Sequence, residues 1–226
     1  MIQFFQWQGI YSKELTPDFE REYRAKERHL VCPLKTEHRE LRRPGPLHHF
    51  VGHNDRNQQI IWGEDIAVHE SVVANFEKEG FTGFRTKPAK VTFQDGQTSD
   101  EYLEFIVTGW AGVVRPESGM RLLESCSACP WKNYGPISDF DQVIDWNQWT
   151  GEDFFFVWPL AGHMLCTQRA AKWLGSSGIL SFQLETGFKA LERRRHSLEY
   201  GLPRGALSNY LPEDLSIKYG RPLGLE

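Results

Sequence analysis

The chain has 226 residues, a length that fits one or two domains and allows a hydrophobic core without disulfide or metal cross-links. Hydrophobic residues make up 40% and aromatic residues 13%, including fifteen Phe and eight Trp, which favours strands and large contact surfaces over a helical bundle. The net charge of −4 argues against a nucleic-acid-binding or membrane-surface protein, because such proteins carry a basic excess. Without an apolar run near the length of a membrane helix, or a signal peptide at its start, the sequence predicts a soluble, cytoplasmic protein.

The first part of the chain is expected to contain strands and a long loop. Residues 1–9 alternate well enough for a strand at a sheet edge, with Phe4 and Trp7 to bury. Residues 32–52 are rich in Pro, Gly and His, a composition typical of a loop. A short strand is predicted over residues 58–62.

An amphipathic helix followed by glycine and a strand is predicted twice, over residues 62–84 and 146–182. In the second copy the apolar run Phe154–Trp158 predicts a strand buried on both faces, and Thr167 can cap the helix. A shift of 98 residues aligns the copies without a gap, pairing Ile66 with Met164, Val68 with Cys166, Val72 with Ala170, Val73 with Ala171, Phe76 with Leu174, Gly80 with Gly178 and Phe84 with Phe182. The sequence thus predicts a duplicated helix–strand unit, the alternative being that any two amphipathic helices followed by glycine look alike.

The remaining segments complete the predicted fold. Residues 91–107 have the pattern of a hairpin with a longer loop, and the tail 191–226 is expected to be an extended arm or partly disordered. We therefore predict a single α+β domain over residues 1–190, with a mixed or antiparallel sheet covered by the two helices of the duplicated unit. The cysteine-bearing loops 29–52 and 118–136 are expected to pack together as a small appendage.

The cysteines suggest a metal site. Cys126 and Cys129 have the two-residue spacing that lets one tight turn present two thiolates to a tetrahedral metal. A structural site needs two more ligands, and the upstream donors are Cys32 and one of the histidines His29, His38, His48 and His49. The alternatives are a metal-free pair of thiols and a redox disulfide, although the residues after Cys129 fit a thioredoxin-like helix poorly. Cys166 lies on the apolar face before the second helix and is expected to be buried.

Catalytic chemistry is not predicted. His163 with Cys166, or His69 with Glu70, could form a dyad, but each histidine precedes a predicted helix, where capping is the expected role. The sequence has no phosphate-binding glycine loop, HExxH pair or GxSxG elbow. We therefore expect a protein that is not an enzyme, with an enzyme of unknown chemistry and a zinc-bound structural adaptor as the alternatives.

Four segments of the chain resemble one protein family. They are Val31-Cys32-Pro33, GFTGFRTKPAKVTF, EYLEFIVTGWAGVVRPESGMRLLESCSAC and QWTGEDFFFVWPLAGHMLCTQRAAKWL, and together they cover most of residues 30–185. These segments are similar to the double-CxxCG motif family, bacterial proteins abundant in myxobacteria and described as immunity proteins of swarming-inhibition and type VI secretion toxins.

The resemblance implies a cytoplasmic inhibitor, encoded beside an antibacterial toxin, that binds the toxin and occludes its active or substrate-binding site. It also implies a structural zinc site, but the first CxxCG is reduced here to Cys32 and the second lacks its glycine. A histidine must then complete the site, with His38 as the first candidate and His48 as the second. The implied ligands are Cys32, His38, Cys126 and Cys129, and the resemblance implies no other cofactor, no direct nucleic-acid partner and no membrane.

The acidic residues are candidates for the toxin-binding surface. If the toxin is a nuclease, its substrate groove is basic, and carboxylates could occupy the groove and speed association by electrostatic steering. The candidates are Asp95, Asp100, Glu101 and Glu104 on the predicted hairpin, and Asp139, Asp141 and Asp145 before the second copy of the unit. The alternative for either group is an ordinary solvated face.

Overall fold

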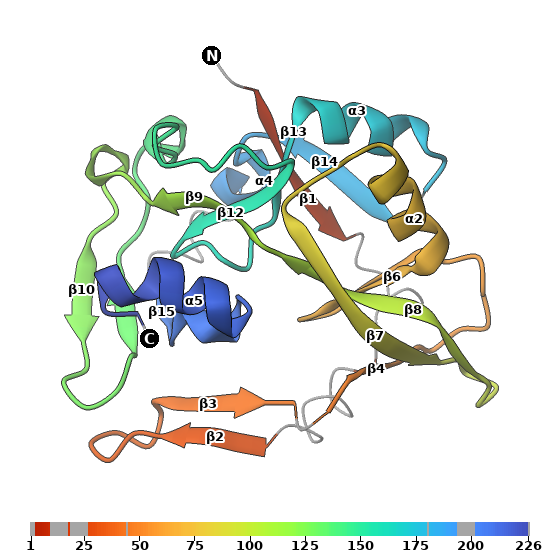
Figure 1. The fold of residues 1–226 in the computed structure, drawn as a ribbon. Helices are drawn as coiled ribbons and strands as arrows, with labels where there is room; N and C mark the ends of the chain where they lie inside the picture. The colour runs from red at the N-terminus through yellow and green to blue at the C-terminus, as the bar shows by residue number, and fades with distance from the viewer. Residues whose placement is uncertain are drawn as a thin grey trace.

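The computed structural model describes residues 3–9, 18, 27–43, 45–179, 181–193 and 202–225, and these residues form an α+β fold with few helices (Figure 1). One mixed sheet, the β1 sheet, has the order β14 (Phe182–Thr186), β1 (Phe4–Gly9), β13 (Leu165–Thr167), β12 (Phe154–Trp158) and β9 (Gly109–Val113). The other, the β8 sheet, has the order β4 (Leu47–Phe50), β7 (Phe84–Thr92), β8 (Thr98–Val107), β6 (Ile66–His69) and β5 (Ile60–Trp62). Neighbouring strands are antiparallel except for β9 with β12 and β4 with β7.

Smaller elements surround the two sheets. The strands β2 (Glu27–Val31) and β3 (Arg39–Arg42) form a hairpin, and β10 (Leu122–Ser125), β11 (Lys132–Tyr134) and β15 (Leu202–Arg204) form a three-stranded sheet. The α-helices are α2 (Glu70–Lys78), α3 (Gln168–Ser176), α4 (Lys189–Arg193) and α5 (Glu213–Gly220), and short 3₁₀ turns cover Pro116–Ser118, Phe140–Gln142, Leu207–Asn209 and Arg221–Leu223. Among the described residues, no helix has both the length and the apolar character needed to cross a membrane.

One hydrophobic core is shared by the two sheets and by the helices α2 and α3. In β12, Phe154 points into this shared core and Phe155 points to a second cluster on the opposite face of the β1 sheet. All five residues of β12 are buried, as predicted for a strand covered on both faces. Trp7 of β1 packs edge-on against Trp62, with their ring centroids 5.0 Å apart. The prediction of an edge strand at residues 1–9 is therefore wrong, because β1 lies between β13 and β14.

The helices use the apolar stripes that the sequence predicts. The buried residues are Val72, Val73 and Phe76 of α2 and Ala170, Ala171 and Leu174 of α3. Thr167 caps α3, as predicted, and His69 caps α2 by accepting a hydrogen bond from the backbone N–H of Ser71 at 3.2 Å. After each helix a glycine takes a left-handed conformation that L-residues avoid: Gly80 has φ 66° and Gly178 has φ 79°.

The stretch 32–52, predicted as a loop, contains two strands. β3 pairs with β2, and β4 pairs in parallel with β7. Isolated prolines and glycines are compatible with short strands when they fall between them, and here Pro46 directly precedes β4. The hairpin predicted over residues 91–107 is present, since β7 and β8 are antiparallel neighbours, but a short turn joins them in place of the longer loop expected.

The C-terminal segment also differs from the prediction. The sequence predicts an extended arm or a partly disordered tail over residues 191–226, but the described residues 202–225 hold β15 and α5. Its residues Leu207, Leu211 and Leu225 are buried in the shared core. Tyr219 stacks on Trp110 with ring centroids 5.0 Å apart. These apolar residues are spread among prolines without helical periodicity, so their burial depends on the rest of the fold. Residues 194–201 and 226 lie outside the described residues.

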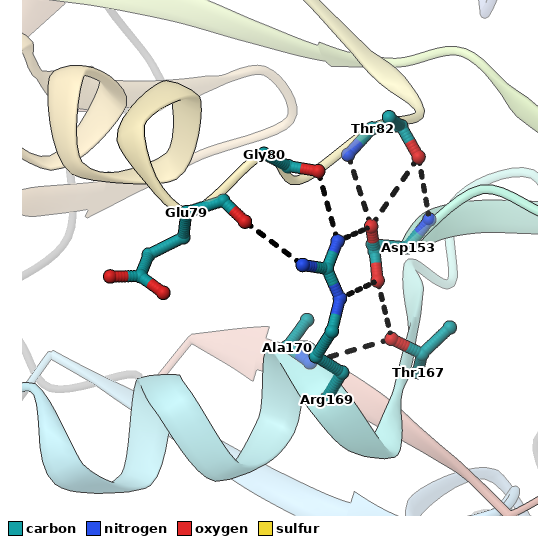
Figure 2. Close-up of polar contacts among 7 residues, drawn as sticks. All are labelled: Glu79, Gly80, Thr82, Asp153, Thr167, Arg169 and Ala170. Carbon is teal, nitrogen blue, oxygen red and sulfur yellow. Dashed lines mark hydrogen bonds and ion pairs between the residues drawn. The ribbon is translucent and has the colours of Figure 1, made fainter.

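An arginine–aspartate pair joins the end of α2 to the start of α3 (Figure 2). Arg169 Nε and Nη2 donate to the carboxylate of Asp153 at 3.1 and 2.5 Å, and its Nη1 and Nη2 also donate to the carbonyl oxygens of Glu79 and Gly80 at 2.9 Å. Asp153 accepts a further hydrogen bond from Thr167 Oγ1 at 2.8 Å. Burial acts to raise the pKa of Asp153, but the hydrogen bonds from Arg169 and Thr167 outweigh it, so the pKa lies below its usual value.

Candidate metal centre

Two hairpins bring the four predicted ligands together. The turn between β2 and β3 carries Cys32 and His38, and the turn between β10 and β11 carries Cys126 and Cys129. One ligand atom from each residue lies within 4.8 Å of the others, so the cluster could hold a metal ion. The structure therefore places His38, the first histidine candidate, with the three cysteines.

The spacing of the ligand atoms suits a tetrahedral ion. The Sγ atoms of Cys32 and Cys126 are 3.6 Å apart, and Sγ of Cys129 is 3.7 Å from Nδ1 of His38. In a tetrahedral zinc site with Zn–S bonds of about 2.3 Å, neighbouring ligand atoms are separated by about 3.8 Å. Thiolates and imidazole are also the donors that zinc prefers over oxygen-binding ions such as Mg²⁺. The residues present thus fit the implied ion.

The other histidine candidates have different partners. Nε2 of His48 lies 2.8 Å from Oγ1 of Thr92, on the neighbouring strand of the β8 sheet. Nε2 of His49 lies 3.2 Å from the carbonyl oxygen of Asp65. His48, the second candidate for the fourth ligand, is therefore not part of the cluster, because β4 carries both histidines into the β8 sheet.

Backbone N–H groups donate to two of the sulfur atoms, and the pKa values of Cys126 and Cys129 are shifted in opposite directions. The N–H of Leu34 donates to Sγ of Cys32 at 3.4 Å, and the N–H of Ala128 donates to Sγ of Cys126 at 3.5 Å. The Ala128 hydrogen bond is the largest influence on Cys126, and the pKa of this thiol is lowered to about 6. Burial raises the pKa of Cys129 to about 11. A bound cation would favour the thiolate form of both.

The surroundings hold the ligands in place. Cys32 and His38 are each only 3% exposed, and the His38 ring stacks on Trp131 with centroids 3.9 Å apart. At the surface, Nζ of Lys35 lies 2.5 Å from Oε1 of Glu124 and links the two hairpins. Apart from Trp131, these supporting residues are not indicated by the sequence pattern around the cysteines. Trp131 lies two positions after Cys129, and this proximity is the one signal in the sequence. The ion pair of Lys35 and Glu124 gives no such signal, because these residues are distant in sequence.

The predicted acidic residues on the β7–β8 hairpin differ in exposure. Asp95 and Asp100 are exposed and pair with Arg56 at 2.6 Å and Lys90 at 3.5 Å. Glu101 is exposed and faces His69. Glu104 is 7% exposed, and its Oε2 accepts a hydrogen bond from Nη2 of Arg43 at 2.8 Å. As a buried member of an ion pair, Glu104 is not part of an exposed acidic surface.

The second acidic group lies around the 3₁₀ turn Phe140–Gln142. Asp139 caps this turn by accepting a hydrogen bond from the N–H of Asp141 at 3.0 Å. Asp145 accepts one from the N–H of Asn147 at 3.1 Å. Asp139 and Asp141 are exposed and Asp145 is half-buried, so the first two remain accessible to a partner.

The histidines of the two possible catalytic dyads, His69 and His163, contact other residues. His69 caps α2, as expected, and its Nε2 lies 3.7 Å from the carboxylate of Glu101. Nδ1 of His163 lies 3.1 Å from Nε2 of Gln6, and the expectation that His163 caps a helix is wrong, because β13 separates it from α3. Cys166 is fully buried in the shared core, as predicted.

No model of a known protein family matches this chain, and no curated protein matches its sequence. The cluster of three cysteines and one histidine is therefore the principal structural observation from which a function can be argued.

Proposed function

We propose that this protein is an immunity protein that binds a cognate antibacterial toxin in the cytoplasm and covers its active or substrate-binding site. The observation that carries this proposal is the meeting of two cysteine turns whose residues Cys32 and Cys126 are 94 positions apart. The resemblance to the double-CxxCG family implies two such turns. Their convergence supports the resemblance, since chance similarity gives no reason for the four ligands to meet.

We further propose that the cluster binds zinc as a structural ion. Four protein ligands fill a tetrahedral shell and leave no open position for a substrate. Among the described strands, β2 pairs with β3 alone, so an ion would anchor this hairpin to the rest of the protein. Zinc would then contribute to stability and leave the chemistry of inhibition to the protein surface.

Metal analysis tests the zinc proposal. Protein purified without chelator is expected to contain one zinc ion per chain, and Cys126→Ser and Cys129→Ser variants to contain far less. Cys166→Ala is the matched control, because Cys166 lies in the shared core and its loss leaves the cluster intact. A wild-type protein that folds without any transition metal would exclude the structural ion.

For the toxin-binding surface we propose the β7–β8 hairpin with Asp95, Asp100 and Glu101. Figure 1 shows the turn end of this hairpin projecting from the molecule, where a groove of a partner could receive it. The pairs of Asp95 with Arg56 and Asp100 with Lys90 are solvent-exposed, so exchanging them for a partner's cations would cost little. The group at Asp139 and Asp141 is the second candidate surface.

We also infer that the two large sheets descend from a duplicated unit. In this interpretation β1 and β8 are the first strands of the two copies, and each pairs in the sheet of the other copy. A shift of 98 residues carries the start of α2, Glu70, onto the start of α3, Gln168. The same shift carries Gln6 of β1 onto Glu104 of β8. Glu104 pairs with Ala67 and Lys87, and Gln6 pairs with Leu165 and Glu185. The shift also carries Ala67 onto Leu165 and Lys87 onto Glu185. These matching registers support the duplication.

A protection assay tests the inhibitory function. A host that produces the toxin encoded beside this gene should survive only when this protein is present, and the two purified proteins should elute as one complex. Replacing Asp95, Asp100 and Glu101 by Lys should abolish protection, while the control pair Asp139→Lys and Asp141→Lys should retain it. Failure to protect against any neighbouring gene product would contradict the proposal, and protection without a complex would favour an enzyme.

A further inference from the structure

A polar cleft of about 550 Å³ lies beside the start of α2 and the segment that follows α3. Its lining includes Asp55, Gln59, His69, Ser71, Gly178 and Ser181. None of these residues belongs to the metal cluster, so the cleft is a separate feature.

The strands β5 and β6 with helix α2 form one half of the fold, and the strands β12 and β13 with helix α3 form the other. The cleft occupies the position in the first half that the arginine–aspartate pair occupies in the second. The N–H of His69 donates to the carbonyl oxygen of Gln59 at 2.8 Å, and the N–H of Thr167 donates to the carbonyl oxygen of Asp153 at 2.9 Å. Both His69 and Thr167 are the capping residues of their helices. Gln59 therefore stands where Asp153 stands in the other half.

The remaining positions follow from the helices. Ser71 is the second residue of α2, as Arg169 is of α3, and Gly178 follows α3 as Gly80 follows α2. In the second half, the Arg169 guanidinium fills the space between these elements and donates to the Gly80 carbonyl oxygen (Figure 2). Ser71 is too short to do so, and its hydroxyl contacts its own neighbour His69 at 2.8 Å. The space that a guanidinium fills in one half is open in the other.

The chemistry of the cleft suits a cation that donates several hydrogen bonds. Ser181 is 8% exposed, and its Oγ has no hydrogen-bond partner among the described residues. Asp55 supplies a carboxylate, and the C-terminal end of α3 supplies the negative end of a helix dipole. Arg56 also lines the cleft, but its guanidinium is already engaged, since its Nη2 donates to Asp95 at 2.6 Å and to Gln97 at 2.9 Å.

We propose that this cleft binds a guanidinium group supplied from outside the chain, as free arginine or as an arginine side chain of another polypeptide. The planar group would lie as the Arg169 guanidinium lies in the other half, with its N–H groups directed at oxygens of Gln59, Gly178 and Ser181. The inference rests on these positions and does not depend on the proposed inhibition of a toxin.

Titration with methylguanidinium, followed by amide NMR shifts of Gln59, Ser71 and Ser181, tests the proposal. We expect saturable shifts with a millimolar dissociation constant, as befits a ligand of few atoms, and no comparable effect of methylammonium at the same ionic strength. Equal affinity for free arginine and for arginine blocked at both ends would indicate an arginine side chain as the ligand. Much tighter binding of free arginine would indicate the amino acid.

Two variants complete the test. Ser71→Arg, at an exposed position, supplies the guanidinium from the chain itself and should weaken methylguanidinium binding about tenfold or more, whereas Ser71→Ala should leave it unchanged. Gln59→Asp recreates the Asp153 carboxylate and should strengthen binding about tenfold. Shifts that do not saturate, equal shifts with methylammonium, or unchanged binding in both Ser71→Arg and Gln59→Asp would overturn the proposal.

Discussion

Asp153 remains charged although it is buried, because its neighbours replace the water it loses. Its side chain is 9% exposed and accepts hydrogen bonds from Arg169, Thr167 and Thr82. Arg169 in turn satisfies carbonyl oxygens at the end of α2, where helical hydrogen bonding stops. The pair therefore links two helices, and its buried member, the Asp153 carboxylate, would be costly to leave unpaired.

Replacing Asp153 should reveal how much this link contributes. Asp153→Asn removes the buried carboxylate and weakens its hydrogen bonds while the half-exposed Arg169 can turn to water, and we expect the free energy of unfolding, measured with urea, to fall by about 2 kcal/mol. The matched control is Asp214→Asn, because Asp214 also pairs bidentately with an arginine, Arg85, but on the surface. Its loss should be far smaller. Equal losses in the two variants would contradict the structural role assigned to Asp153.

The same pair should make stability depend on pH in acid. The pKa of Asp153 is lowered in the folded protein, so its contribution is complete above the unfolded-state pKa of about 3.9 and is lost as the pH falls through the folded-state value. The stability difference between wild type and Asp153→Asn should therefore be constant between about pH 5 and 7 and shrink below about pH 4. Urea unfolding at each pH measures it, and a difference that grows in acid would reverse the assigned sign.

At the scale of elements, the metal cluster should control the β2–β3 hairpin. This hairpin pairs with no other described strand, and it contributes Cys32 and His38 to the cluster. If zinc is bound, chelation should lower the hydrogen-exchange protection of the β2 and β3 amides by about tenfold or more, while β12 amides keep theirs. Cys129→Ser should reproduce the effect and Cys166→Ala should not. Loss of protection throughout the protein would show that the ion stabilises the whole fold.

Gly83 marks a close approach between the two sheets. It has φ 87°, and a Cβ atom there would overlap the carbonyl oxygen of Phe154. Gly83→Ala should lower the free energy of unfolding by about 3 kcal/mol, because backbone strain and overlap add. Gly96→Ala, at φ 80° in the open β7–β8 turn, should cost only about 1 kcal/mol. Thermal or urea unfolding measures both, and equal effects would show that the sheets separate easily at Gly83.

Elements defined by local pattern could be predicted from the sequence, whereas their partners could not. The stripes of α2 and α3, the cap Thr167 and the buried run of β12 depend on neighbours within one or two turns of chain. The placement of β1 between β13 and β14 depends on residues about 160 positions away, as the pair Phe5 and Cys166 illustrates. The metal ligands are an intermediate case, because spacing indicated Cys126 and Cys129, whereas His38 was one of several upstream histidine candidates.

At the scale of the molecule, the N-terminal strand β1 connects the two large sheets. β1 lies in the sheet of β12, β13 and β14, and β8, which follows β7 directly, lies with β5, β6 and β7. Trp7 of β1 contacts rings from both sheets, including Trp62 and Phe154, so this one strand connects the halves through the shared core.

Splitting the chain in the β7–β8 turn should therefore yield fragments that fold only together. The fragment 1–96 keeps β1 without its sheet, and 97–226 keeps β13 and β14 without the strand that lies between them. We expect each fragment alone to show a poorly dispersed NMR spectrum, and the mixture to form a 1:1 complex with cooperative unfolding, because association restores the shared core. The control fragment 10–96, which lacks β1, should fail to restore folding of 97–226. If 97–226 folded alone with full dispersion, β1 would be an accessory strand that its sheet does not require.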